Sequence, residues 1–155
     1  MVRYLPIRSA LLRALFRICL LGVVVIQSPA LQAREVDQSQ AARLLWSTMI
    51  AIQVANDSGN YSTLRDWGAP SFKQSNSTRE LAEIFSGLRE ANIDLSMTLL
   101  IEPVYTIKPQ LRDDGLLRMR GQFPLRPKTI NFDLLFQPIM GRWRLIGVAV
   151  IAGDP

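Results

Sequence analysis

The sequence predicts an α+β fold in which three N-terminal helices pack on a curled antiparallel sheet of four long strands. Up to about residue 92, apolar residues recur at the three- and four-residue spacing of amphipathic helices. From Asp94 onward they alternate singly with polar residues, as in strands with one buried face. Short turns with Pro or Gly separate these runs, so we expect consecutive hairpins.

The first 33 residues differ from the rest of the chain. Four arginines and no acidic residue accompany an apolar run at 18–26, and small residues follow it up to Ala30 and Ala33. This order predicts a secretory signal peptide over residues 1–33, cleaved after Ala33 or Ala30. We therefore expect a bacterial periplasmic or secreted protein. The alternative is an uncleaved inner-membrane anchor, the only case in which membrane contact is expected.

Removing that segment changes the charge of the chain. The full sequence has 18 basic and 13 acidic residues, but four of the basic residues precede residue 34, which leaves 14 basic residues and a net charge of +1. A nearly neutral domain gives no support to nucleic-acid binding. The single cysteine, Cys19, lies in the segment and the chain has no histidine. The mature domain, 34–155, is thus predicted to have no disulfide, no Cys/His metal site, no cofactor and no imidazole base.

The first predicted helix begins at Asp37–Gln40, which has the form of a capping box, and ends near Ala55. Gly59 follows in a polar stretch and is free to adopt a left-handed conformation. A second, short helix is predicted over 62–67, ending at Gly68.

The third predicted helix follows a capping box at Ser77–Glu80. Its apolar positions have the spacing of one buried stripe: Leu81, Ile84, Phe85 and Leu88. Between the second and third helices, Ser71–Gln74 is predicted as a short edge strand.

Four long strands are predicted at 95–107, 116–124, 128–137 and 142–152, the first of them bent at Pro103. In the third strand every second residue is apolar and is assigned to the inner face: Ile130, Phe132, Leu134 and Phe136.

This element order resembles the NTF2-like superfamily, the cone-shaped α+β roll shared by nuclear transport factor 2, ketosteroid isomerase and SnoaL-type cyclases. The resemblance covers about residues 35–152 and includes GRWRLIGV at 141–148, which is similar to the W-r-I-x-x-v ending of that superfamily. It implies a sheet that curls around the helices into a cone, with ligands or active sites at the open end.

The resemblance supplies no catalytic residue for this chain. Scytalone-dehydratase-like members rely on histidine, and isomerase-like members use an Asp base with Tyr and protonated Asp donors. Here Asp133 has the parity of the outer face, Asp94 is expected in a turn or cap, and Tyr105 is the only tyrosine in the sheet region. We predict a non-enzymatic binding or protein-interaction module. The alternatives are a SnoaL- or isomerase-like lyase or isomerase with an apolar cavity, and a structural subunit of an envelope or secretion assembly.

Aromatic and sulfur-containing side chains are predicted on the faces that converge between helices and sheet. They either line a pocket for a small apolar ligand or form a filled core. These ligand-pocket candidates are Trp46, Met49, Phe85, Tyr105, Met119, Phe132, Phe136 and Trp143.

A second group of apolar side chains has the parity of the outer sheet face. This group is Leu100, Leu135, Ile146, Val148 and Val150. Together they would form a larger patch than a monomer usually exposes. Because NTF2-like proteins commonly dimerise through this face, we expect a homodimer or docking on another envelope protein. The same face is predicted to carry cross-strand charge pairs of Arg118, Arg120 and Arg144 with Asp133.

Overall fold

The structure of the chain, a computed structural model, describes residues 36–154. The predicted signal peptide, with both cleavage positions and Cys19, lies outside the described residues. Within residues 36–154, no helix has the length and apolar character needed to cross a bilayer.

The described residues form an α+β fold around one curled, unclosed antiparallel sheet. Its strands are β1 (Val104–Leu111), β2 (Leu117–Phe123), β3 (Thr129–Ile139) and β4 (Arg142–Gly153). Each strand pairs with the next along the chain, in the order β1-β2-β3-β4. The predicted hairpin order and the last three predicted strands are therefore confirmed.

The first predicted strand is wrong in its first half. Leu95–Leu100 form a 3₁₀ helix, η1, and the strand itself starts only at Val104. Leu95 and Thr98 are buried three residues apart, which is the repeat of a 3₁₀ helix rather than of a strand. Asp94 caps η1 as predicted, since its carboxylate accepts a hydrogen bond from the Ser96 backbone N–H at 2.9 Å.

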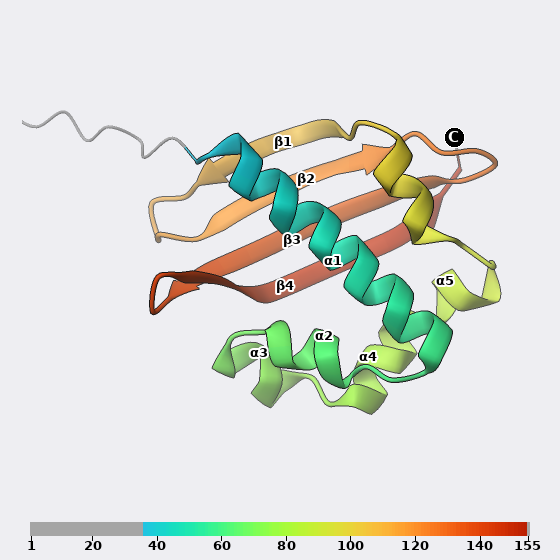
Figure 1. The fold of residues 1–155 in the computed structure, drawn as a ribbon, viewed down its shortest axis with the longest axis horizontal. Helices are drawn as coiled ribbons and strands as arrows, with labels where there is room; N and C mark the ends of the chain where they lie inside the picture. The colour runs from blue at the N-terminus through green and yellow to red at the C-terminus, as the bar shows by residue number, and fades with distance from the viewer. Residues whose placement is uncertain (1–35, 155) are drawn as a thin grey trace, which may run out of the picture. The chain divides into compact units, whose positions relative to one another are not determined.

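Helix α1 (Gln38–Ser58) is the longest helix among the described residues and lies across one face of the sheet (Figure 1). The Asp37 side chain caps it by accepting from the Ser39 N–H, and Gly59 ends it with a left-handed φ of 68°. Gln40 does not complete the predicted capping box. Its side-chain oxygen accepts instead from the Trp143 indole N–H at 3.0 Å, joining α1 to β4.

The remaining helices are α2 (Ser62–Trp67), α3 (Pro70–Ser75), α4 (Thr78–Ile84) and α5 (Ser86–Glu90). In Figure 1, α2, α3 and α4 gather beyond β4, and Gly68, the residue after α2, forms an isolated parallel bridge with Leu145 of that strand. The edge strand predicted at Ser71–Gln74 is wrong, because Pro70 occupies the first turn of a helix that includes these residues.

The third predicted helix is divided into α4 and α5 at Phe85. Its capping box is confirmed: Glu80 N–H donates to the Ser77 hydroxyl, and the Glu80 carboxylate accepts from Ser77 N–H. Leu81, Phe85 and Leu88 are buried as predicted, but Ile84, the last residue of α4, is 54% exposed.

A β-bulge in β4 changes which residues face the core. Leu145 pairs with Phe136 and Gly147 pairs with Leu135, which leaves Ile146 as an extra residue without a partner in β3. From Gly147 onward the side-chain alternation is shifted by one residue relative to an unbroken strand. As a result, Val148 lies opposite Leu134 and Val150 lies opposite Phe132.

Candidate functional site

Most of the predicted pocket residues are core residues in the structure. Five of the eight are at most 3% exposed and belong to one hydrophobic cluster between the helices and the sheet: Met49, Phe85, Met119, Phe132 and Phe136. Trp46, Tyr105 and Trp143 are partly buried and pack against this cluster. Of the two interpretations left open by the sequence, a filled core fits the five buried residues.

Aromatic rings continue this core toward β1. Phe123 lies 5.4 Å from Phe132 and 6.5 Å from Trp46, measured between ring centroids, and Tyr105 meets Phe132 edge-on at 5.9 Å. Burial, with a smaller effect from the charge of Glu102, raises the pKa of the Tyr105 phenol above its usual value. Tyr105 is thus a neutral wall residue at neutral pH.

The five apolar residues predicted to form a patch on the outer sheet face do not gather there in the structure. Val150 is 3% exposed and faces the core, and Val148 packs against the core. Leu100 is exposed but lies in η1, outside the sheet. Leu135 and Ile146 are half-buried, and Ile146 is the extra residue of the bulge. The bulge explains the error for the two valines, because the parity count assumed an unbroken strand.

The charge pairing predicted on the outer face is confirmed for two of the three arginines. Arg118 forms a two-pronged ion pair with Asp133, with Nε–Oδ1 at 3.0 Å and Nη2–Oδ2 at 2.6 Å. Arg120 Nε lies 3.8 Å from the same carboxylate. Asp133 therefore pairs with arginines on the outer face of the sheet, where it also lines an open hollow of about 510 Å³. Arg144 has no carboxylate within 4 Å among residues 36–154.

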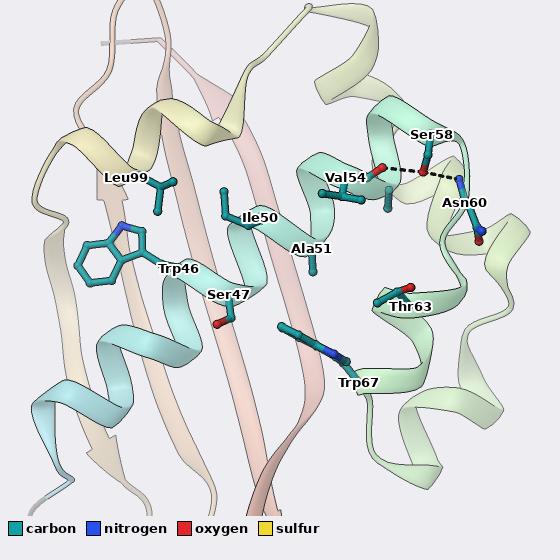
Figure 2. A pocket seen from close by; sticks show the side chains of 11 residues that line it. Trp46, Ser47, Ile50, Ala51, Val54, Ser58, Asn60, Thr63, Trp67 and Leu99 are labelled. Atoms are coloured by element: carbon teal, nitrogen blue, oxygen red, sulfur yellow. Dashed lines mark hydrogen bonds between the residues drawn. The ribbon is translucent and has the colours of Figure 1, made fainter.

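An apolar groove of about 520 Å³ lies on the side of α1 and involves α2 and η1. Figure 2 shows Trp46, Ile50 and Val54 on α1, Leu99 on η1 and Trp67 reaching toward α1 from α2. The sequence reasoning missed this groove. Its signal is a second apolar stripe at four-residue spacing, Trp46, Ile50 and Val54, beside the stripe that enters the core.

The polar groups of the groove are uncharged. Ser58 donates its hydroxyl to the Val54 carbonyl at 2.6 Å and accepts from Asn60 N–H at 3.2 Å, as Figure 2 shows. The Trp46 indole N–H donates to the Thr98 carbonyl at 3.0 Å, which fixes that ring. The Trp67 indole N–H makes no hydrogen bond within the described part of the chain, so it remains available for an acceptor. None of the described residues that line the groove is ionisable.

A larger hollow of about 720 Å³ lies between the start of α1 and β1. Glu102, Tyr105 and Lys108 line it, but Glu102 and Lys108 are exposed. Isomerase-like chemistry needs a carboxylate whose pKa burial has raised, and this hollow does not contain a buried carboxylate among the described residues.

Within residues 36–154, no group of three or more Asp or Glu side chains is placed to hold a metal ion. Comparisons with models of known protein families, with curated protein sequences and with solved structures give no match to this chain.

Proposed function

We propose that this chain is an exported, non-enzymatic binding domain that holds an apolar group in the groove between α1, α2 and η1. The observation that carries the proposal is a groove of about 520 Å³ lined by two tryptophans and aliphatic side chains without an ionisable residue. That volume lies in the range of small-ligand sites, which are mostly apolar with a few polar groups.

The same composition argues against catalysis in the groove. General acid–base or nucleophilic chemistry needs a titratable or activated group within hydrogen-bond reach of the substrate. The hydroxyls of Ser47 and Thr63 and the indole of Trp67 can donate hydrogen bonds, whereas the Ser58 hydroxyl already donates to Val54, and no base lies beside them among the described residues of the groove. Such groups orient a bound molecule rather than transform it.

The proposal includes an NTF2-like cone and export across the inner membrane. Support for the fold comes from the helices that precede a four-stranded antiparallel sheet in hairpin order and from the long helix across one of its faces. Support for export comes from the order of basic, apolar and small residues in the first 33 positions.

The test is titration of the purified protein with dodecanol, a neutral apolar chain, followed by tryptophan fluorescence. We expect saturable binding, because Trp46 and Trp67 both line the groove. Val54→Gln should weaken it about tenfold, since covering a half-exposed Val side chain contributes about 1 to 1.5 kcal/mol.

Ile151→Gln is the matched control. Ile151 is 61% exposed on the outer sheet face, against 58% for Val54 in the groove, so both variants exchange a similarly exposed apolar side chain for the same polar one. We expect Ile151→Gln to bind dodecanol like the unaltered protein. Absence of saturable binding, or equal weakening in the two variants, would show that the groove is not the binding site.

A further inference from the structure

The apolar groove adjoins a second, smaller hollow. This hollow has a volume of about 210 Å³, lies between α1 and the start of β4, and shares Ser47 and Trp67 with the groove. Phe136 and Leu145 form part of its apolar floor, and Arg43 and Arg144 also line it. Trp67 therefore lies between an uncharged groove and a hollow lined by two arginine residues.

The two arginines are the only ionisable residues lining either hollow in the described part of the chain. Neither has a carboxylate within 4 Å among residues 36–154. Two acidic side chains lie near this region in sequence, Asp37 close to Arg43 and Asp66 beside Trp67, and each has a partner of its own. Hydrogen bonds from Ser39 are the main cause that lowers the pKa of Asp37, and the charge of Arg43 is a smaller one. The Asp66 carboxylate oxygen lies 3.4 Å from Lys73 Nζ.

The residues of α1 that line the two hollows run along the helix from the end near the arginines into the groove. Arg43, Ser47, Ile50 and Val54 follow one another at three- and four-residue spacing, so they lie along one side of the helix. From Ser47 to Ser58, which both line the groove, the helix rises about 16 Å. This length suits an extended acyl chain of medium length, with one end of the chain near the arginines.

We infer that the groove binds a single-chain anionic amphiphile, with its acyl chain between α1, α2 and η1 and its carboxylate between Arg43 and Arg144. The inference rests on the proposed function and adds the charge and the orientation of the ligand. A guanidinium presents a planar fork of donors that matches a carboxylate, and Trp67, whose indole N–H makes no hydrogen bond within residues 36–154, lines both hollows.

The experiment compares three ligands with the same chain length: dodecanoate, dodecanol and dodecyltrimethylammonium. Each is titrated below its micelle-forming concentration and followed by tryptophan fluorescence. We expect dodecanoate to bind about tenfold more tightly than dodecanol, and the cation to bind most weakly. High salt should reduce the preference for dodecanoate, because the arginines are partly exposed and their charges are screened.

Arg43→Gln with Arg144→Gln should make dodecanoate and dodecanol bind equally, while dodecanol affinity stays unchanged. Arg126→Gln is the matched control, because it removes one exposed arginine from the β2–β3 turn, and it should leave the preference intact. If the double variant fails to fold, Arg43→Gln alone should lower the preference several-fold, since Arg43 is exposed.

The outcomes separate the two proposals. Binding of dodecanol without a preference for dodecanoate would overturn the anionic head-group site and leave the apolar groove standing. A preference that survives loss of both arginines would also overturn it. If none of the three ligands binds, the proposed function itself fails.

Discussion

Replacing Tyr61 by Phe tests the interpretation that a buried polar cluster joins three helices. Tyr61 is 1% exposed at the start of α2, and its hydroxyl donates to Asn56 Oδ1 at 2.5 Å. The same hydroxyl oxygen accepts from Arg89 Nη1 of α5. The Tyr61 ring stacks on Phe85, with the ring centroids 6.3 Å apart. The Tyr61→Phe variant keeps that packing and removes only the hydroxyl.

The expected cost follows from the groups left behind. Among residues 36–154, Asn56 Nδ2 is buried without a hydrogen-bond partner and Asn56 Oδ1 accepts only from the Tyr61 hydroxyl, so loss of that hydroxyl leaves the whole side-chain amide unsatisfied. An unsatisfied buried polar group costs about 1 to 3 kcal/mol. Arg89 is affected less, because its Nη2 still donates to the Ala82 carbonyl at 2.8 Å. We expect the free energy of unfolding to fall by about 2 kcal/mol.

Urea unfolding followed by circular dichroism measures this change. With slopes of about 1 to 3 kcal/mol per molar urea, the midpoint should fall by roughly 1 M. Tyr105→Phe is the matched control, because the Tyr105 hydroxyl makes no hydrogen bond within residues 36–154, and it should change stability by less than about 0.5 kcal/mol. Equal stabilities of the two variants would refute the reasoning, as would a loss below about 0.5 kcal/mol in Tyr61→Phe.

Three further predictions concern the sheet, a helix terminus and the assembly. Gly121→Ala should destabilise the protein by about 1 to 3 kcal/mol in urea unfolding, because the added Cβ would lie 2.4 Å from the Val104 carbonyl oxygen, and native-like stability would contradict this. Hydrogen bonds from Ser77 hold the pKa of Glu80 below its ordinary 4.5. Above pH 4.5 the Glu80→Gln variant should therefore be less stable than the unaltered protein, and this difference should vanish as the pH falls through the folded-state pKa of Glu80. A stability difference that persists in acid would count against this explanation. Self-association through the outer sheet face stays a prediction, and a monomeric mass by sedimentation at micromolar concentration, with no partner recovered from the envelope, would contradict it.

The sequence predicted the parts of the fold that depend on local signals. The capping box at Ser77, the helix stop at Gly59 and the alternation in β3 each depend on a few neighbouring residues, and the structure confirms all three. The errors in secondary structure arise where one local pattern is compatible with two kinds of element. Leu95–Leu100 alternate like a strand, but burial of every third residue makes a 3₁₀ helix there.

The residues of the candidate site are brought together by tertiary contacts, which local sequence patterns do not show. The parity of β4 could not be counted from the sequence because the bulge at Ile146 is defined by its pairing with β3. Likewise, Trp67 becomes part of a groove only because α2 lies beside α1 and β4, which no local signal indicates. Trp46 was predicted as a pocket residue and lines both this groove and, with Tyr105, the hollow between the start of α1 and β1.

The bulge in β4 also determines which changes in chain length the sheet can absorb. Deletion of Ile146 would leave every existing partner of β3 in place, because Leu145 and Gly147 already occupy neighbouring positions opposite Phe136 and Leu135. Deletion of Ala149 would make Val148 and Val150 adjacent, so one of them would have to leave the core. Homologous chains one residue shorter in this strand are thus compatible with the same core when the missing residue is at the bulge.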